Sequence, residues 1–143
     1  MVTIQHRTTI DRRPNDVFAY VADTTNDPAW HTDLVEVRRT DTGPIGLDSE
    51  FEVRIKPFMG QTTGSLRVTG HEPDSRFELR GRMGPISPTI GYTFRPSNGG
   101  TEVSRTVAVE WPGVMRLVQV PLRPILARRN ARFLANLKQV LER

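Results

Sequence analysis

Residues 126–142, LARRNARFLANLKQVLE, decide the fold because they form one long amphipathic helix. From Pro124 to Arg143 no glycine and no further proline interrupts the pattern. Its basic side chains take the other faces, and its apolar stripe consists of Leu126, Phe133, Leu134, Leu137, Val140 and Leu141. A helix of about 20 residues is about 30 Å long, which is enough to cross a whole sheet.

The sheet itself is predicted by the alternation of apolar and polar residues that fills most of the chain before this helix. Turn sequences such as SNGG separate the strands, which are predicted at 34–40, 49–57, 61–72, 76–82, 88–96 and 101–111. Alternation places Val35, Val37 and Trp111 on the inward face, whereas Glu36 and Glu52 face water. Such an antiparallel sheet has one wet face, and its other face needs the C-terminal helix as a cover.

The N-terminal part of the chain adds one more strand and two short helices. Residues 2–10 alternate as a strand, and Pro14 suits the first turn of a helix over 14–23. A second short helix or a turn begins at Pro28, within the sequence NDPAW. The predicted order is therefore a strand, two short helices, six more strands and a long helix.

The composition of the 143-residue chain is that of an ordinary globular protein, with 36% apolar and 25% charged residues. It has no cysteine, which excludes disulfides and cysteine-ligated metals. Neither a signal peptide nor a membrane-spanning apolar run is visible, so we expect a cytoplasmic protein. The net charge of +4 invites nucleic-acid binding, but arginines alternate with acids along the strands, as in FELRGR, and we predict no nucleic-acid partner.

This order of elements resembles the START-like, or SRPBCC, superfamily, and within it the bacterial polyketide cyclase/dehydrase branch. The segments that carry the resemblance are IDRRPNDVFAYVADTTNDPAWH, LVEV, GPIGLDSEFEV and LARRNARFLANLKQVLE. The resemblance implies an α+β helix-grip fold, in which a curved seven-stranded antiparallel sheet wraps around the C-terminal helix. It also implies one ligand-binding domain over 1–143, with a cavity between sheet and helix. In this fold we expect Asp27 to cap the second short helix and Trp30 to plug the corner beside it.

Arg105 and Tyr92 are the polar candidates for the cavity wall, since both alternate in phase with apolar residues on their strands. An inward Arg105 must be paired or bind an anion, such as a ligand carboxylate, enolate or phenolate. The alternatives are an internal salt bridge or a strand end at which its side chain reaches water. The hydroxyl of Tyr92 either donates to a substrate carbonyl or bonds to the backbone. Asn130, near the apolar stripe of the helix, either reaches a ligand or pairs with the sheet backbone.

The histidines are the weaker catalytic candidates. His6 alternates with Ile4 on the first strand and would face inward as a general base or as a wall residue. His31 precedes Asp33 by two residues, so the two are either a base with its orienting carboxylate or simply surface groups. No metal-ligand spacing and no phosphate-binding loop is present, and we predict no metal and no other cofactor.

Three functions remain open at this level. The first is binding of a hydrophobic or aromatic small molecule of the lipid, polyketide or isoprenoid class. The predicted lining is Phe51, Val53, Phe77, Leu79, Tyr92, Phe94, Arg105, Asn130, Phe133 and Leu137. The second is a cyclase or dehydratase acting in the same cavity, with Arg105, Tyr92, His6 or His31 as its catalytic groups. The third is lipid delivery or another interaction, with transient membrane-surface contact through residues 111–132.

Overall fold

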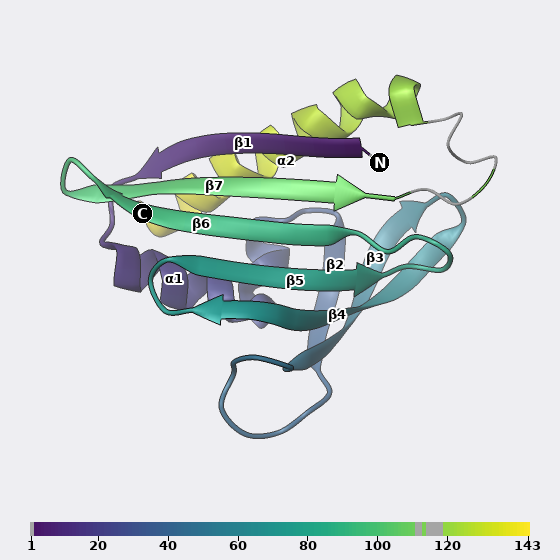
Figure 1. Ribbon diagram of the computed structural model, residues 1–143, viewed down its shortest axis with the longest axis horizontal. Coiled ribbons are helices and arrows are strands. Elements are labelled where there is room, and N and C mark those ends of the chain that lie inside the picture. The colour runs from purple at the N-terminus through teal and green to yellow at the C-terminus, as the bar shows by residue number, and fades with distance from the viewer. Residues whose placement is uncertain (1, 111–112, 114–118) are drawn as a thin grey trace.

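The computed structural model describes residues 2–110, 113 and 119–143, and seven strands in these ranges form one antiparallel sheet. The strands are β1 (Val2–Ile10), β2 (Leu34–Arg39), β3 (Glu50–Phe58), β4 (Gln61–Glu72), β5 (Arg76–Arg82), β6 (Thr89–Ser97) and β7 (Gly100–Val109). Their order in the sheet is β1-β7-β6-β5-β4-β3-β2 (Figure 1). The first two strands of the chain therefore lie at opposite edges of the sheet.

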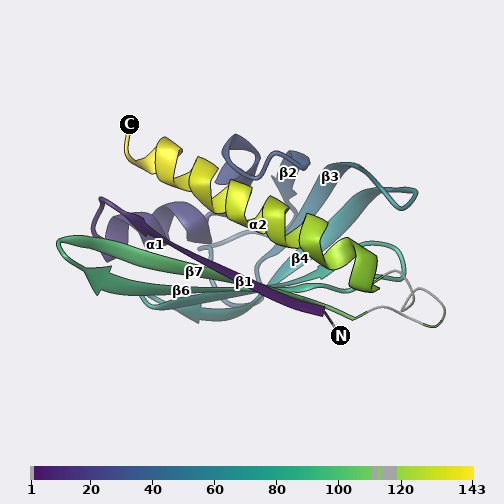
Figure 2. The ribbon, with the colours of Figure 1, turned by 90° about the horizontal axis from the view of Figure 1, so that it is seen from above.

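Three helical elements complete the fold: α1 (Pro14–Ala22), the 3-10 helix η1 (Thr24–Ala29) and α2 (Gln119–Leu141). Figure 2 shows α2 crossing the curved sheet, with β1 and β7 on one side and β2 and β3 on the other. The helix-grip prediction is thus confirmed. The long helix begins at Gln119, so Pro124 lies inside it. A proline at such a position removes one intrahelical hydrogen bond, but the helix continues through it.

The inward positions of the sheet follow the predicted alternation except at the start of β2. A register shift between Leu34 and Glu36 turns Val35 outward, where 44% of its surface is exposed. The inward prediction for Val35 is therefore wrong, because a bulge shifts the alternation by one residue. Val37 packs against the core as predicted, and Trp111 lies outside the described residues.

The corner between the short helices and the sheet is built around Trp30, which is fully buried. Asp23, not Asp27, caps η1, since its carboxylate accepts a hydrogen bond from the Thr25 backbone N–H at 3.2 Å. The backbone carbonyl of Asp27 accepts from the N–H groups of Trp30 at 3.0 Å and His31 at 2.7 Å. The side chain of Asp27 is instead buried below the corner.

Candidate functional site

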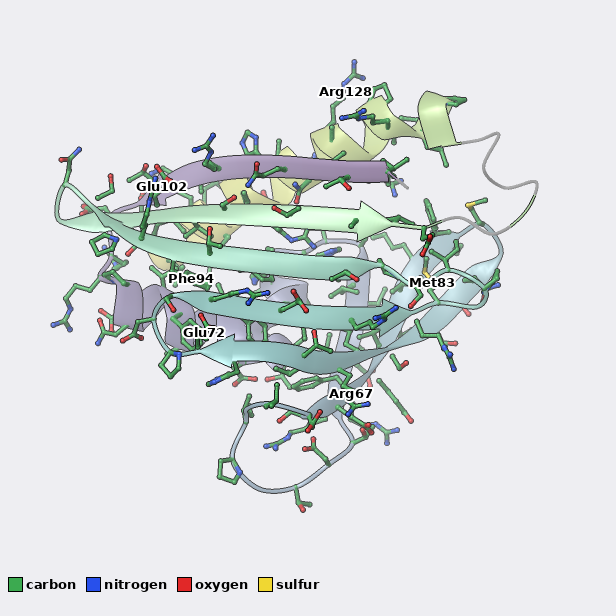
Figure 3. All side chains as sticks on the ribbon, in the orientation of Figure 1. Arg67, Glu72, Met83, Phe94, Glu102 and Arg128 are labelled. Atoms are coloured by element: carbon green, nitrogen blue, oxygen red, sulfur yellow. The ribbon has the colours of Figure 1, made fainter. Side chains whose placement is uncertain are left out.

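The space between sheet and helix is filled at one end and open at the other. At the α1 end, the Phe18 ring packs edge-on against Phe94 at 5.3 Å and Phe77 at 6.3 Å between ring centroids. Phe77 in turn lies 6.0 Å from the Tyr92 ring. Figure 3 shows Phe94 at the end of the sheet that α1 covers and Met83 at the opposite end. The rings that pack beneath α1 therefore fill the interior at that end of the sheet.

A cavity of about 450 Å³ occupies the Met83 end. Most of its wall is apolar, and polar groups border it from β7, α2 and the segment that follows η1. The lining includes Ile4, His31, Asp33, Leu34, Val53, Ile55, Phe58, Leu66, Met83, Ile86, Ile90, Arg105, Val107, Leu126, Arg129, Asn130 and Phe133. A volume of this size falls within the range of about 300–1,000 Å³ that small-molecule sites occupy.

Arg105 is the central polar group of the wall, and only 4% of its surface is exposed. Its Nε donates to the Tyr92 hydroxyl at 3.1 Å, and its Nη1 donates to Asn130 Oδ1 at 2.6 Å. Asn130 completes a reciprocal pair, because its Nδ2 donates to the Arg105 backbone carbonyl at 3.1 Å. These bonds hold the guanidinium in one orientation at the edge of the cavity, and among the described residues they use two of its five N–H groups.

The Arg105 guanidinium is surrounded by aromatic rings. The guanidinium carbon lies 5.6 Å from the Phe133 ring centroid, 5.7 Å from Tyr92 and 6.0 Å from Trp30. In the ranges that the structure describes, no carboxylate forms a salt bridge with Arg105. The alternative of an internal salt bridge is therefore not realised among these residues, and Arg105 remains a buried cation beside an apolar cavity.

Burial shifts the pKa values of three groups near this cation. Burial raises the pKa of Asp27 well above its usual range, and the Arg105 charge opposes this only in part. Burial also raises the pKa of Tyr92 to about 12, so its hydroxyl stays protonated. Burial first, and the Arg105 charge second, lower the pKa of His31 well below its usual value. We therefore expect His31 to be a neutral imidazole at neutral pH.

The two histidine candidates end up in different places. His31 borders the cavity and stacks on Phe133, with 3.9 Å between ring centroids and 20° between ring planes. Asp33 pairs with Arg129 at 3.5 Å across the cavity rim, so among the described residues it does not take the role of an orienting carboxylate for His31, which was one of the two alternatives. His6 is exposed at the edge strand β1 and does not border the cavity, because the strand edge leaves its side chain uncovered.

Unmet hydrogen-bonding capacity is concentrated in the segment that carries His31. Among the described residues, four buried side-chain atoms have no hydrogen-bond partner: Thr24 Oγ1, Asp27 Oδ1, Trp30 Nε1 and His31 Nδ1. An unpaired buried polar atom costs about 1–3 kcal/mol. Unpaired hydrogen-bond donors and acceptors therefore lie in the same corner as the Arg105 cation, and the rest of the interior is mostly apolar.

The predicted lining divides between the cavity and the filled end. Val53, Arg105, Asn130 and Phe133 border the cavity. The other predicted residues are buried in the packed core instead: Phe51, Phe77, Leu79, Tyr92, Phe94 and Leu137. They belong to one buried cluster that also contains Phe18 and Trp30. Tyr92 still acts on the site through its bond to Arg105.

Several cavity residues escaped the sequence prediction. Ile86 lies in the segment MGPISP, whose proline and glycine indicate a turn, yet it is buried beside Ile4 and Val109. Ile4 could have been predicted from the alternation of the first strand, whereas no local sequence pattern marks Ile86 as a cavity residue. Within the parts of the chain that are described, no cluster of three His, Asp or Glu side chains suited to a metal is found, and no helix is long and apolar enough to cross a membrane.

Comparison with known proteins places the chain among proteins of the same architecture. A family model described as polyketide cyclase / dehydrase and lipid transport matches residues 1–142. A protein of Thermus thermophilus superposes with a TM-score of 0.80 at 13% identity, covering 98% of this chain and 97% of that one. Ara h 8.0201 superposes with a TM-score of 0.72 at 13% identity, covering 99% of both chains.

A third similar structure is a two-domain protein. The di-domain ARO/CYC BexL, from the BE-7585A biosynthetic pathway, has a TM-score of 0.72 at 16% identity. The match covers 98% of this chain and 47% of BexL. At such identities the likeness shows the fold alone. No curated protein sequence matches this chain significantly.

Proposed function

Because the chain belongs to the polyketide cyclase / dehydrase and lipid transport family, we propose that it binds a hydrophobic or aromatic small molecule between its sheet and α2. The observation that carries this proposal is the 450 Å³ cavity with a mostly apolar wall and one fixed cation, Arg105. An apolar wall favours lipid, polyketide or isoprenoid skeletons, because binding there removes their apolar surface from water.

The fixed cation supports a more specific ligand class. A guanidinium held by Tyr92 and Asn130 is pre-oriented, so binding an anion there costs little further ordering. Only 4% of the Arg105 surface is exposed, and an oxyanion is a stronger partner for a buried guanidinium than a neutral group. We therefore propose a ligand with an apolar body and one carboxylate, phenolate or enolate oxygen directed at Arg105.

Two fluorescent probes of nearly the same shape test both parts of this proposal. The probes are the anion 1-anilinonaphthalene-8-sulfonate and its uncharged relative N-phenyl-1-naphthylamine. Leu126→Trp fills the cavity, whereas Ile125→Trp adds the same side chain one residue away at an exposed position. We expect Leu126→Trp to weaken both probes by about tenfold or more, equivalent to about 1.4 kcal/mol, and Ile125→Trp to change neither.

The charge is tested separately. Arg105→Gln should weaken the sulfonate probe by about tenfold or more and leave the uncharged probe within about threefold. Circular dichroism and a thermal melt show whether each variant keeps its fold. Probe binding that is insensitive to Leu126→Trp in a folded variant would overturn the cavity site. Equal losses of both probes in Arg105→Gln would overturn the anion preference alone.

A second candidate function is dehydration of a β-hydroxy ketone in the same cavity. The observation in its favour is that His31 and Arg105 both border the cavity. The neutral imidazole of His31 would take the proton from the carbon next to the ketone, and Arg105 would stabilise the enolate oxygen. The imidazolium then returns its proton to the departing hydroxyl, which leaves as water, and a conjugated enone remains.

Absorbance distinguishes this activity from binding alone. Racemic 4-hydroxy-4-(2-naphthyl)butan-2-one loses water to give an enone with a new near-ultraviolet band. The enzyme hypothesis predicts turnover that His31→Gln abolishes while the sulfonate probe still binds. Unchanged hydroxy ketone in the presence of folded protein, with the probe bound normally, would leave the binding function and remove the dehydratase hypothesis for this substrate class.

A further inference from the structure

The rim of the cavity is formed by the β3–β4 turn and the first half of α2. Arg129 connects the two, since its guanidinium lies 5.8 Å from the Phe58 ring centroid and both residues border the cavity. Met59 follows Phe58 at the turn, and Ile125 lies one helical turn before Arg129 on the same side of α2. Met59 and Ile125 therefore flank the same edge of the cavity.

These two apolar side chains are exposed, and basic side chains share the outward face of α2 with Ile125. Met59 has 43% and Ile125 46% of its surface exposed. Ile125, Arg128 and Arg132 are spaced three and four residues apart, so they share one outward face of α2. Figure 3 shows Arg128 on α2 pointing away from the sheet. The rim thus presents apolar tips among cations.

The two segments that form this rim, the β3–β4 turn and α2, carry basic but no acidic residues. Residues 119–141, which form α2, contain four arginines and one lysine but no aspartate or glutamate. The turn sequence KPFMGQ, residues 56–61, likewise has no acid. Of the ion pairs between described residues, Arg129 with Asp33 and Lys138 with Glu142 are those that α2 makes. Lys56, Arg128 and Arg132 form no ion pair with any carboxylate among the described residues, so their charges are available to a partner.

We propose that this rim, made of Lys56, Met59, Ile125, Arg128 and Arg132, docks on a lipid bilayer that carries anionic headgroups. The apolar tips enter the interface while the cations contact the lipid phosphates and carboxylates. Docking in this way turns the mouth of the cavity toward the lipid. The inference goes beyond ligand binding, because it depends on exposed side chains that do not include Arg105.

Flotation with lipid vesicles tests the docking directly. The full chain is mixed with vesicles of phosphatidylcholine alone or of phosphatidylcholine with phosphatidylserine. We expect binding to the mixed vesicles, little to phosphatidylcholine alone, and weakening as salt rises. Each basic side chain at an anionic surface strengthens partitioning about fivefold, so Arg128→Gln/Arg132→Gln should weaken it about 25-fold. Ile125→Asp should weaken it at least as much as one lost cation.

Matched variants elsewhere exclude a simple effect of net charge or of apolar exposure. Arg67→Gln/Arg80→Gln removes two exposed cations from β4 and β5. Leu47→Asp changes a 63% exposed leucine in the loop between β2 and β3, on the far side of the molecule from α2 (Figure 1). Both should bind mixed vesicles as the parent does.

Three results would overturn the proposal. They are no flotation with mixed vesicles, equal flotation with both vesicle types, or equal loss in the rim and control variants. Arg105→Gln should float with mixed vesicles as the parent does. Flotation therefore tests docking alone, and the probe titrations test ligand binding alone. Circular dichroism confirms that each variant is folded.

Discussion

Replacing Asn130 by alanine is the sharpest test of how the cavity cation is held. The change removes the acceptor 2.6 Å from Arg105 Nη1 and the donor 3.1 Å from the Arg105 carbonyl. Losing a hydrogen bond to a charged group costs about 1.5–3 kcal/mol, and losing a neutral one costs about 1 kcal/mol. Water entering from the adjacent cavity recovers part of this, so we expect a loss of about 3 kcal/mol in the free energy of unfolding.

Asn136→Ala is the matched control on the same helix. Asn136 makes one neutral hydrogen bond, from Nδ2 to the Trp30 carbonyl at 3.1 Å, and it is half-buried. Its removal should cost about 1 kcal/mol. The gain in helix propensity from asparagine to alanine is common to both variants, so it cancels in the comparison. The difference between the two losses therefore reports the bond to the Arg105 guanidinium.

Urea unfolding followed by tryptophan fluorescence measures the free energy of unfolding of both variants, and a thermal melt measures their Tm. For a domain of this size, about 3 kcal/mol corresponds to a fall in Tm of roughly 10 °C, against roughly 3 °C for Asn136→Ala. Equal losses in the two variants would refute the reasoning. That result would mean that Asn130 does not hold the charge and that the guanidinium is satisfied by other groups.

Other substitutions test separate parts of the structure. Tyr92→Phe removes the acceptor of the buried guanidinium Nε and should cost about 2 kcal/mol in urea unfolding, whereas a loss below about 0.5 kcal/mol would contradict that bond. The raised pKa of Asp27 means that its ionisation destabilises the folded state, so stability falls as pH rises from the unfolded-state pKa of about 4 toward the folded one. Asp27→Asn should therefore raise Tm at pH 7, by an amount that shrinks toward pH 4, and a constant difference would disprove the sign. Gly100→Ala places a Cβ 2.5 Å from the Ile10 carbonyl oxygen and should cost about 3 kcal/mol, whereas Gly91→Ala, with open space around its Cβ, should change stability by less than about 1 kcal/mol; equal thermal melts would refute the clash.

Most of the fold was predictable because its elements carry strong local signals. The alternation of Phe51 and Val53 sets the inward face of β3, and the long stripe of α2 needs a sheet to cover it. The exception at Val35 has a local cause that alternation does not report. A bulge adds one residue to β2, and the phase before it is lost.

The site was predictable only in part: Arg105, Asn130, Val53 and Phe133 border the cavity as expected, and the other predicted residues do not. Arg105 stands out in the sequence because a charge in phase with Val103 and Val107 demands a partner. Which end of the interior stays open depends on where α1 docks, and that is a property of tertiary packing. Phe18 fills the space in front of Phe94, so apolar inward residues of equal promise end up in core or cavity according to their distance from α1.

The order of the strands in the sheet also governs when the protein can fold during synthesis. β1 pairs along its whole length with β7, so Val2 lies opposite Val109. The hairpins from β3 to β6 can form as they emerge, but β1 waits for almost the entire chain, and α2 emerges later still. Contacts between such distant segments slow folding, and until they form the concave apolar face of the sheet is uncovered. We therefore expect nascent chains that end before Val109 to depend on chaperones, and full-length chains to lose this dependence once α2 has docked.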